Sequence, residues 1–191
     1  VAKSGDNFVS TISASEGTSI KIADLGSGSG CLGLTLGLEM PTSEVTLIEK
    51  SPEAFEFAKN NLHSLVDETH RSRFQLENKA VEDFTPPYRF HIIVANPPYI
   101  GEEDTEVATN VKAFEPHEAL FAADQGMAII SSWLNFVVDS LEPGGVSYFE
   151  IGHKQGSAVK VLFQTKNCFQ SVDLIQDFNQ RDRIIRAVKY G

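Results

Sequence analysis

Residues 20–39 read I-K-I-A-D-L-G-S-G-S-G-C-L-G-L-T-L-G-L-E and divide into three parts. Ile20–Leu25 alternates apolar side chains as a β-strand does, whereas Cys31–Glu39 is typical of a helix. Between them, Gly26–Gly30 carries a glycine at every second position. Such a turn before a helix N-terminus lets a ligand approach the backbone closely. The stretch predicts an α/β fold with a ligand at this turn; the alternative is an ordinary strand–helix turn with no ligand.

The surroundings of the glycine turn indicate which ligand it takes. The spacing is G-x-G-x-G, which differs from the G-x-G-x-x-G of dinucleotide-binding proteins, and the phosphate-binding lysine pattern is absent. Asp24 precedes the turn, where a carboxylate can receive an ammonium group. Glu49 ends the next apolar run, 45–48, where an acidic residue accepts ribose hydroxyls. A ribose and an ammonium group without phosphate describe S-adenosylmethionine. The predicted contacts are Asp24, Gly26, Ser27, Gly28, Ser29, Gly30 and Glu49.

A second motif, Asn96-Pro97-Pro98-Tyr99, follows the apolar run 90–95, which reads as a buried strand. Proline fixes φ and has no N–H, so the corner is stiff and its carbonyls are free. One NH2 group can donate two hydrogen bonds here, one to the side-chain amide oxygen of Asn96 and one to the backbone carbonyl oxygen of Pro97. We expect Asn96, Pro97 and Tyr99 to act in catalysis, and Pro98 to help bind the substrate. The motif predicts group transfer to a weakly nucleophilic nitrogen.

Strand and helix patterns alternate along the rest of the sequence. Ser51 and Pro52 form a helix start, because serine caps helices and proline fits their first turn. Repeated strand–helix units predict a doubly wound sheet that binds ligands beyond the carboxyl ends of its strands. This places the glycine turn, Glu49 and Asn96 on one rim. The expected strands are 20–25, 45–48, 74–76, 90–95, 146–151, 169–177 and 184–190; further helices are expected from Pro52 and over 126–141 and 155–165.

Composition narrows the class of protein. With 191 residues, 41% of them hydrophobic, the chain fits one globular domain. No apolar stretch is long enough to cross a bilayer and no signal peptide is visible, so we expect a cytoplasmic protein. Cys31 and Cys168 fit no metal-ligand or disulfide pattern, and we expect Cys31 to be a buried packing residue.

The net charge also bears on the partners of the protein. The formal net charge of -10 argues against broad binding to nucleic acid, which requires Lys and Arg to neutralise phosphates. Positive residues gather near the C-terminus, at Arg181, Arg183, Arg186 and Lys189. We interpret this segment as a solvated edge strand whose charges prevent unwanted strand pairing.

The residues Asp24–Cys31 and Asn96–Ile100 resemble those of class I methyltransferases that modify amide or amino nitrogens. More narrowly, the sequence resembles the HemK/PrmC family, the protein-(glutamine-N5) methyltransferases of peptide chain release factors. This resemblance covers residues 20 to 190. The narrower likeness rests on Phe114–Met127, Leu141–Gly145, Glu150–Gly156 and Arg181–Ala187.

The resemblance carries expectations about fold and activity. It implies a Rossmann-like, mostly parallel seven-stranded sheet with an antiparallel last strand. It implies methyl transfer from S-adenosylmethionine, with S-adenosylhomocysteine as product, to the glutamine of a Gly-Gly-Gln motif in a release factor. It also implies that Asn96 contacts the cofactor. Beside the adenine the family has an acidic residue followed by a bulky one; Ala80 aligns with the first and Val81 with the second, although a small shift would put Glu82 or Asp83 at the acidic position. Phe114–Phe121 is expected to form a wall beside the substrate.

The sequence departs from the family at its N-terminus. Members carry an N-terminal helical domain and a Pro-Arg-x-Glu-Thr-Glu-like segment, which 1–19 does not match. We therefore expect 1–19 to be a lead-in segment and 20–191 a catalytic domain, acting as a monomer. Two alternatives stay open. The first is a different NH2 acceptor, on a ribosomal protein glutamine or at adenine N6 of RNA or DNA. The second is a non-catalytic, cofactor-binding partner subunit, which the intact Asn96–Tyr99 corner disfavours.

Overall fold

The computed structural model describes residues 19–98, 100–101, 121–122 and 126–191. The helices are α1 (Cys31–Glu39), α2 (Pro52–Leu65), α5 (Met127–Ser140) and α6 (Gly156–Gln164), with 3-10 turns η2 (Glu68–Arg73) and η3 (Val81–Asp83). The strands are β1 (Lys21–Leu25), β2 (Glu44–Ile48), β3 (Phe74–Glu77), β4 (Phe90–Ala95), β5 (Ile100–Gly101), β6 (Phe121–Ala122), β7 (Leu141–Glu150), β8 (Phe169–Gln176) and β9 (Asp182–Lys189).

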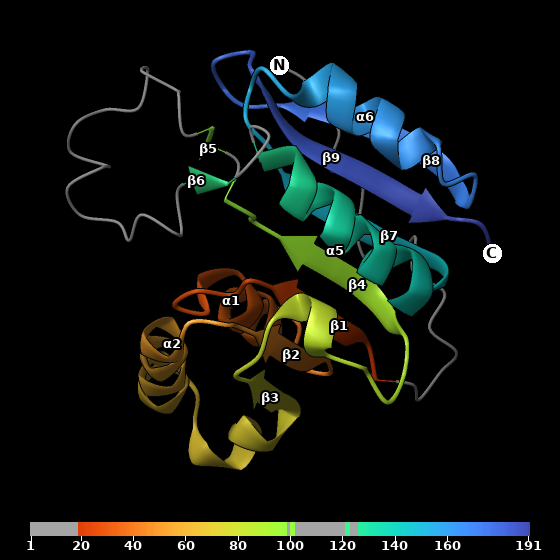
Figure 1. Ribbon diagram of the computed structural model, residues 1–191. Coiled ribbons are helices and arrows are strands. Elements are labelled where there is room, and N and C mark those ends of the chain that lie inside the picture. The colour runs from red at the N-terminus through yellow and green to blue at the C-terminus, as the bar shows by residue number, and fades with distance from the viewer. Residues whose placement is uncertain (1–18, 99, 102–120, 123–125) are drawn as a thin grey trace.

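The main sheet has seven strands in the order β3-β2-β1-β4-β7-β9-β8 (Figure 1). The pairs from β3 to β7 are parallel, and β9 runs antiparallel to both β7 and β8. A separate two-stranded parallel sheet joins β5 to β6. The expected doubly wound sheet with an antiparallel last strand is confirmed. Each strand and helix anticipated from the sequence has its counterpart, with shifts of a few residues at the ends.

The core lies in two clusters, one on each face of the sheet. Ala23 of β1 and Ile93 of β4 pack against α5 and α6, whereas Ile22 and Ile92 pack in the second cluster, which includes residues of α1 and α2. Successive side chains of a strand point to opposite faces, so strands covered on both sides must be apolar at nearly every position. This explains the near-continuous apolar run of β4.

Helix α1 lies close to the sheet because glycine forms most of its buried stripe. Its buried residues are Gly33, Leu34 and Gly37. A Cβ atom on Gly37 would come within 2.3 Å of the Phe74 ring, so a larger residue would push the helix outward. The prediction that Cys31 is buried was wrong, because Cys31 is exposed. It begins the helix ahead of the buried stripe, where the side chain faces away from the sheet.

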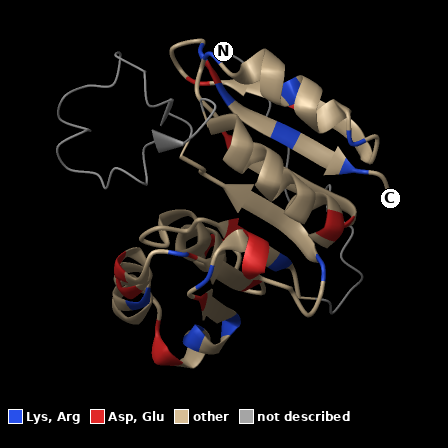
Figure 2. Ribbon diagram, in the orientation of Figure 1, with Lys and Arg blue, Asp and Glu red and all other residues tan. Residues whose placement is uncertain are grey.

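The interpretation of the C-terminal positive residues as an edge strand was also wrong. Strand β9 lies between β7 and β8, and β8 forms the edge of the sheet. Figure 2 shows in blue the positions of positive residues along β9. Arg186 forms a cross-strand ion pair of 3.0 Å with Asp173 of β8. The charges therefore support pairing within the hairpin instead of preventing pairing at an edge.

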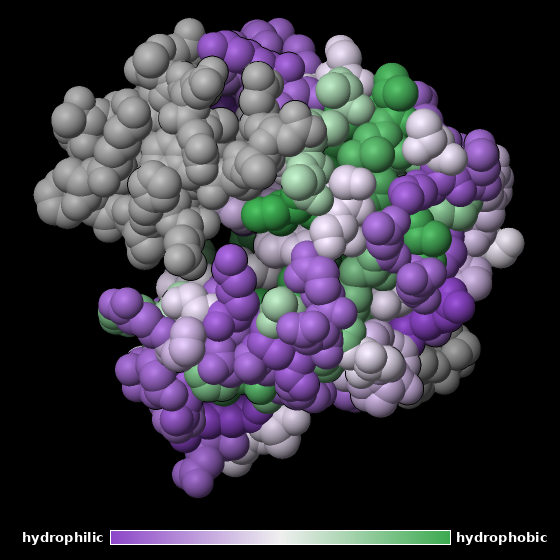
Figure 3. Space-filling view, viewed as in Figure 1, coloured by the Kyte–Doolittle hydropathy of each residue, from purple (hydrophilic) through white to green (hydrophobic). Residues whose placement is uncertain are grey.

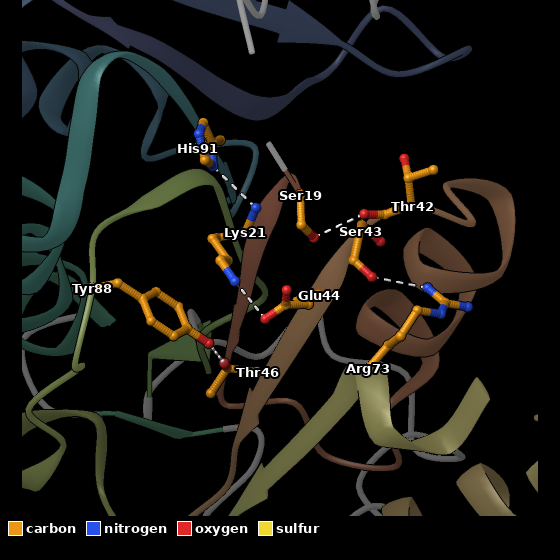
Figure 4. Close-up of polar contacts among 9 residues, drawn as sticks. All are labelled: Ser19, Lys21, Thr42, Ser43, Glu44, Thr46, Arg73, Tyr88 and His91. Atoms are coloured by element: carbon orange, nitrogen blue, oxygen red, sulfur yellow. Dashed lines mark hydrogen bonds and ion pairs between the residues drawn. The ribbon is translucent and has the colours of Figure 1, made fainter. Parts of the chain in front are cut away.

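Polar contacts tie together the amino-terminal ends of the parallel strands (Figure 4). The backbone N–H of Lys21 donates to Nδ1 of His91 at 3.0 Å, and the Lys21 ammonium pairs with Glu44. The Arg73 guanidinium donates to the backbone carbonyl of Ser43 at 2.9 Å and of Gly37 at 3.2 Å. These bonds hold β1, β2, β4 and the end of α1 together at the edge opposite the predicted site.

On the face shown in Figure 3, hydrophobic residues show mainly over α5 and α6, whereas the region around α2 and η2 is largely hydrophilic. Phe57 and Leu65 of α2 are nevertheless exposed hydrophobic residues. Val161 of α6 is among the exposed hydrophobic residues. Within the described ranges, no helix combines the length and the apolar character needed to cross a bilayer.

Candidate functional site

The predicted site residues follow three neighbouring strands that end in register. Leu25 of β1 is aligned with Ile48 of β2 on one side and with Ala95 of β4 on the other. Each of these strands is followed at once by a predicted site residue: Glu49 after β2, Gly26 after β1 and Asn96 after β4. Adjacent strands lie about 4.8 Å apart. The fold therefore brings the glycine turn, the acidic residue and the acceptor corner together at one edge, as the sequence predicts.

The glycine turn is held close to the sheet by both backbone and packing. Gly26 has φ of 64°, and a Cβ atom there would lie 2.4 Å from the Trp133 ring of α5. The Ser27 N–H donates to the Ile48 carbonyl at 3.0 Å, and the Gly30 N–H donates to the Ser27 carbonyl at 2.8 Å. Only glycine meets both the positive φ and the close ring contact at position 26.

The outer part of the turn is open. Gly28 has φ of 55°, and apart from its chain neighbours no described residue has an atom within 4 Å of where its Cβ would be. Beside it, the Ser27 hydroxyl oxygen is buried and has no hydrogen-bond partner in the part of the protein that the structure describes. Buried polar atoms are normally paired, so one without a partner calls for an explanation. An open backbone surface beside a free hydroxyl is suited to receiving a polar ligand.

Glu49 links the turn to the start of α2. Glu49 is only 8% exposed. Oε2 accepts from the Gly28 N–H at 2.8 Å, and Oε1 accepts from the Ser51 N–H at 2.7 Å. A carboxylate can accept about four hydrogen bonds in all. Glu49 thus has its orientation fixed by two backbone amides and keeps acceptor capacity for hydroxyl groups at the turn.

Asp24 lies beneath the turn and is only 1% exposed. Its Oδ2 accepts from the Gly33 N–H at 2.8 Å, which holds the first turn of α1 against β1. Burial raises the pKa of Asp24 from 3.8 to about 7; the Gly33 hydrogen bond acts in the opposite direction and the negative charge of Glu49 adds to the rise. The observed role is to anchor the turn, and the ammonium contact stays a prediction.

The acceptor corner presents its asparagine to solvent. Asn96 is exposed, Pro97 is buried and Pro98 is half-buried. No hydrogen bond engages the Asn96 side chain within the described ranges. The side-chain amide of Asn96 therefore lies next to a buried proline, and its oxygen is available to accept a hydrogen bond. Tyr99 lies outside the described residues, as does most of the segment expected to form a substrate wall, 114–120.

Val81 lies in the main core cluster and is 3% exposed. It also lines a pocket of about 410 Å³ between the 81–86 segment and α5, which extends to Asp139 and Ser140 at the end of that helix. Among the predicted site residues that the structure describes, this pocket is lined by Val81 and by its neighbour Glu82, but not by the glycine turn, Glu49 or Asn96. Because α5 ends at the start of β7, the pocket leads away from the carboxyl edge of the sheet. The adenine contact of Val81 stays a prediction.

The structure adds three positioning residues that sequence reasoning missed. The Asn78 side chain donates to the Glu49 carbonyl at 2.9 Å, and that of Asn61 donates to the Ser29 carbonyl at 2.9 Å. The Trp133 ring packs against Gly26. All three act across 29 or more positions in sequence, which no local pattern reveals. The one available signal was the position of Asn78, two residues after the predicted strand 74–76.

The fold and the site define a class of protein. Residues 3–132 match the family described as "Methyltransferase small domain", and the chain belongs to this family.

Individual proteins with similar sequences give a more specific comparison than the family does. The release factor glutamine methyltransferase of Staphylococcus aureus is 37% identical over 167 residues, which are 86% of this chain and 58% of that protein. That of Vibrio cholerae is 35% identical over 86% of this chain and 56% of its own length. The chain thus spans less than two thirds of the length of these relatives.

Solved structures agree with the fold. A methyltransferase from Pyrococcus furiosus has a TM-score of 0.65 at 17% identity, covering 91% of this chain and 76% of that one. A ribosomal protein L11 methylase from Lactobacillus delbrueckii has a TM-score of 0.61 at 17% identity, covering 93% and 73%. At these identities the likeness shows the fold alone, which is the methyltransferase fold predicted from the sequence.

Proposed function

We propose that the protein is an S-adenosylmethionine-dependent protein-glutamine N5-methyltransferase whose substrate is the Gly-Gly-Gln loop of a peptide chain release factor. The observation that carries this proposal is the register of Ile48, Leu25 and Ala95, which sets Glu49, the glycine turn and Asn96 side by side. The names of the relatives supply the substrate. We further propose that 20–191 forms the catalytic domain and acts as a monomer.

The residues at the turn fit this cofactor. The open backbone at Gly28 leaves room for a ligand, and the unpaired Ser27 hydroxyl supplies a polar contact. Glu49 keeps acceptor capacity for ribose hydroxyls, and its charge suits a cationic ligand without phosphate. The residues that would hold the cofactor are Asp24, Gly26, Ser27, Gly28, Ser29, Gly30, Glu49, Val81 and Asn96. When bound, the cofactor supplies an electrophilic methyl group on a sulfonium ion.

The acceptor corner then orients the substrate. Asn96 Oδ1 and the Pro97 carbonyl oxygen each accept a hydrogen bond from one N–H group of the glutamine amide. These two bonds fix the nitrogen and orient it toward the glycine turn. An amide nitrogen is a weak nucleophile. Holding it in line with the methyl group lowers the entropic part of the activation barrier, because the two reactants are already brought together. The corner offers acceptors without a strong base. We therefore expect the proton to leave after transfer, when the methylated nitrogen has become acidic.

Asn96→Ala tests the corner. Turnover with a release factor should fall by roughly 100-fold, the size of effect seen when one oriented hydrogen-bonding group is removed from an active site. The dissociation constant of S-adenosylmethionine should change far less than turnover, because the turn and Glu49 are untouched and Asn96 is only one of the proposed cofactor contacts. Asn60→Ala, at an exposed asparagine of α2, is the matched control. Wild-type turnover in Asn96→Ala would exclude the acceptor role.

The alternatives are separated by varying the acceptor. Intact-mass and peptide mass spectrometry should find one added methyl on the loop glutamine of the wild-type release factor and none when that glutamine is replaced by glutamate. Methyl transfer to a ribosomal protein or to adenine in RNA or DNA, without transfer to the release factor, would establish the second candidate. Cofactor binding without transfer to any of these would favour the non-catalytic subunit.

A further inference from the structure

The turn between β8 and β9, residues 177–181, lies at the same edge of the sheet as the acceptor corner. Strand β7 runs parallel to β4 and ends at Glu150, which is aligned with Ile184 near the start of β9. The last residue of β8, Gln176, is aligned with Asp182. The tip of this hairpin therefore lies beyond the carboxyl ends of β4 and β7. Strands β9 and β8 are the second and third from β4, so the tip is roughly 10–15 Å to the side of Asn96.

The tip is fixed by hydrogen bonds centred on Asp177. Its Oδ1 accepts from the backbone N–H of Asn179 at 2.8 Å and of Arg181 at 3.0 Å. The Asp177 N–H donates to the Arg181 carbonyl at 2.8 Å, and the Gln180 N–H donates to the Asp177 carbonyl at 3.0 Å. The Arg181 and Asn179 amides also hold the pKa of Asp177 below its ordinary value, with the charge of Arg183 adding to them. The turn is thus pre-organised.

This fixed turn carries Phe178, whose relative exposure of 107% is the highest among the exposed large hydrophobic residues. Such a residue contributes nothing to the core, and leaving it in water forgoes the favourable free energy of burying an aromatic side chain. Aromatic residues on rigid supports are typical anchors of protein interfaces, because little conformational entropy is lost when they bind.

We infer that Phe178 anchors the folded part of the protein substrate, outside the loop that carries the glutamine. The inference rests on the proposed function and adds a second contact to it. The tip is too far from Asn96 for the residues next to the glutamine to reach it, since one residue spans about 3.4 Å at most. A folded domain that delivers its loop to the corner extends over that distance. The expected partner is an apolar patch on this domain.

Phe178→Ser is the test, with Tyr190→Ser as its matched control. Tyr190 is 57% exposed and follows β9 at the opposite edge of the sheet. Phe178→Ser should raise KM for the release factor roughly tenfold, as loss of an aromatic anchor does. Its kcat at saturating substrate, its cofactor affinity and its melting temperature should match the wild type, because Phe178 touches neither core nor cofactor turn. Tyr190→Ser should leave KM unchanged.

Crosslinking tests the contact without requiring methyl transfer. A photoreactive phenylalanine analogue at position 178 should crosslink to the release factor, whereas the same analogue at position 190 should not. An unchanged KM in Phe178→Ser, or equal crosslinking from both positions, would overturn the inference. If the wild-type protein transferred no methyl group to the release factor, the proposed function would be in doubt, and crosslinking would still decide the role of the hairpin.

Discussion

At the scale of single residues, Asp24 combines two demands that oppose each other. Its carboxyl group holds the Gly33 N–H and so fixes α1 beneath the glycine turn. Full burial next to Glu49 makes its ionised form unfavourable, which raises its pKa to about 7. The folded protein therefore keeps a proton at pH values where the unfolded protein has already released it.

This predicts a pH-dependent stability. Between pH 3.8 and about 7 the folded state binds more protons through Asp24, so the free energy of unfolding should fall as pH rises through that window. The upper limit of this loss is about 4 kcal/mol. Asp24→Asn removes the titration, so the variant should gain stability relative to the wild type between pH 5 and pH 8, measured by urea unfolding. Asp67→Asn, at an exposed position, is the control. Parallel curves for Asp24→Asn and wild type would contradict the prediction.

Much of the site was predictable because its residues lie in short, continuous motifs. The glycine turn, Glu49 and Asn96 each follow a strand that the apolar pattern identifies, and the parallel arrangement then brings them to one edge. The buried state of Asp24 was not predictable, since it depends on a close approach of α1 that the glycines at 33 and 37 permit. Asn61, Asn78 and Trp133 reach the site only through the fold.

At the scale of elements, the sheet is secured at the edge opposite the site, where Arg73 joins the start of β3 to α1 and β2. Its Nη1 donates to the carbonyls of Gly37 and Ser43. The guanidinium also lies over the Phe74 ring at 5.1 Å. Phe74 in turn fills the space left by Gly37. One arginine thus links a helix end, a strand start and the packing between them.

Arg73→Ala should therefore destabilise the fold by about 2–3 kcal/mol, because two carbonyls lose a charged donor and the aromatic contact is removed. Cofactor affinity should change little, since these contacts lie at the far edge. Urea unfolding measures the first effect and equilibrium titration the second. Arg181→Ala, at an exposed arginine of the hairpin tip, is the control. Equal stability of the two variants would show that the Arg73 contacts contribute nothing.

Strand order marks the limit of sequence reasoning at this scale. The seven strands could be located, but the insertion of β9 between β7 and β8 does not follow from local patterns. A segment with Arg or Lys at every second or third position looks like a protected edge. Here the charges pair across to Asp173 and donate to backbone carbonyls, as Lys189 does with Leu141. The same spacing of positive residues can thus belong to an interior strand when partners distant in sequence pair with the charges.

At the scale of the whole molecule, the geometry of the site depends on packing against both faces of the main sheet. Cluster residues on both faces fix the register of β1, β2 and β4, and this register sets the spacing of Glu49, the glycine turn and Asn96. A slip of one residue in β4 would exchange its two faces and move Asn96 away from the turn. The chemistry is therefore supported by the entire core.

The contact between Trp133 and Gly26 has a practical consequence. The protein has one tryptophan, and its ring lies against the first glycine of the glycine turn. Tryptophan emission responds to changes in the polarity and charge around the indole, so arrival of a cationic ligand at the turn should alter the fluorescence of the unlabelled protein. Trp133→Phe should abolish the signal. The protein thus contains an intrinsic optical probe with which ligand affinity can be followed in every variant that keeps this residue.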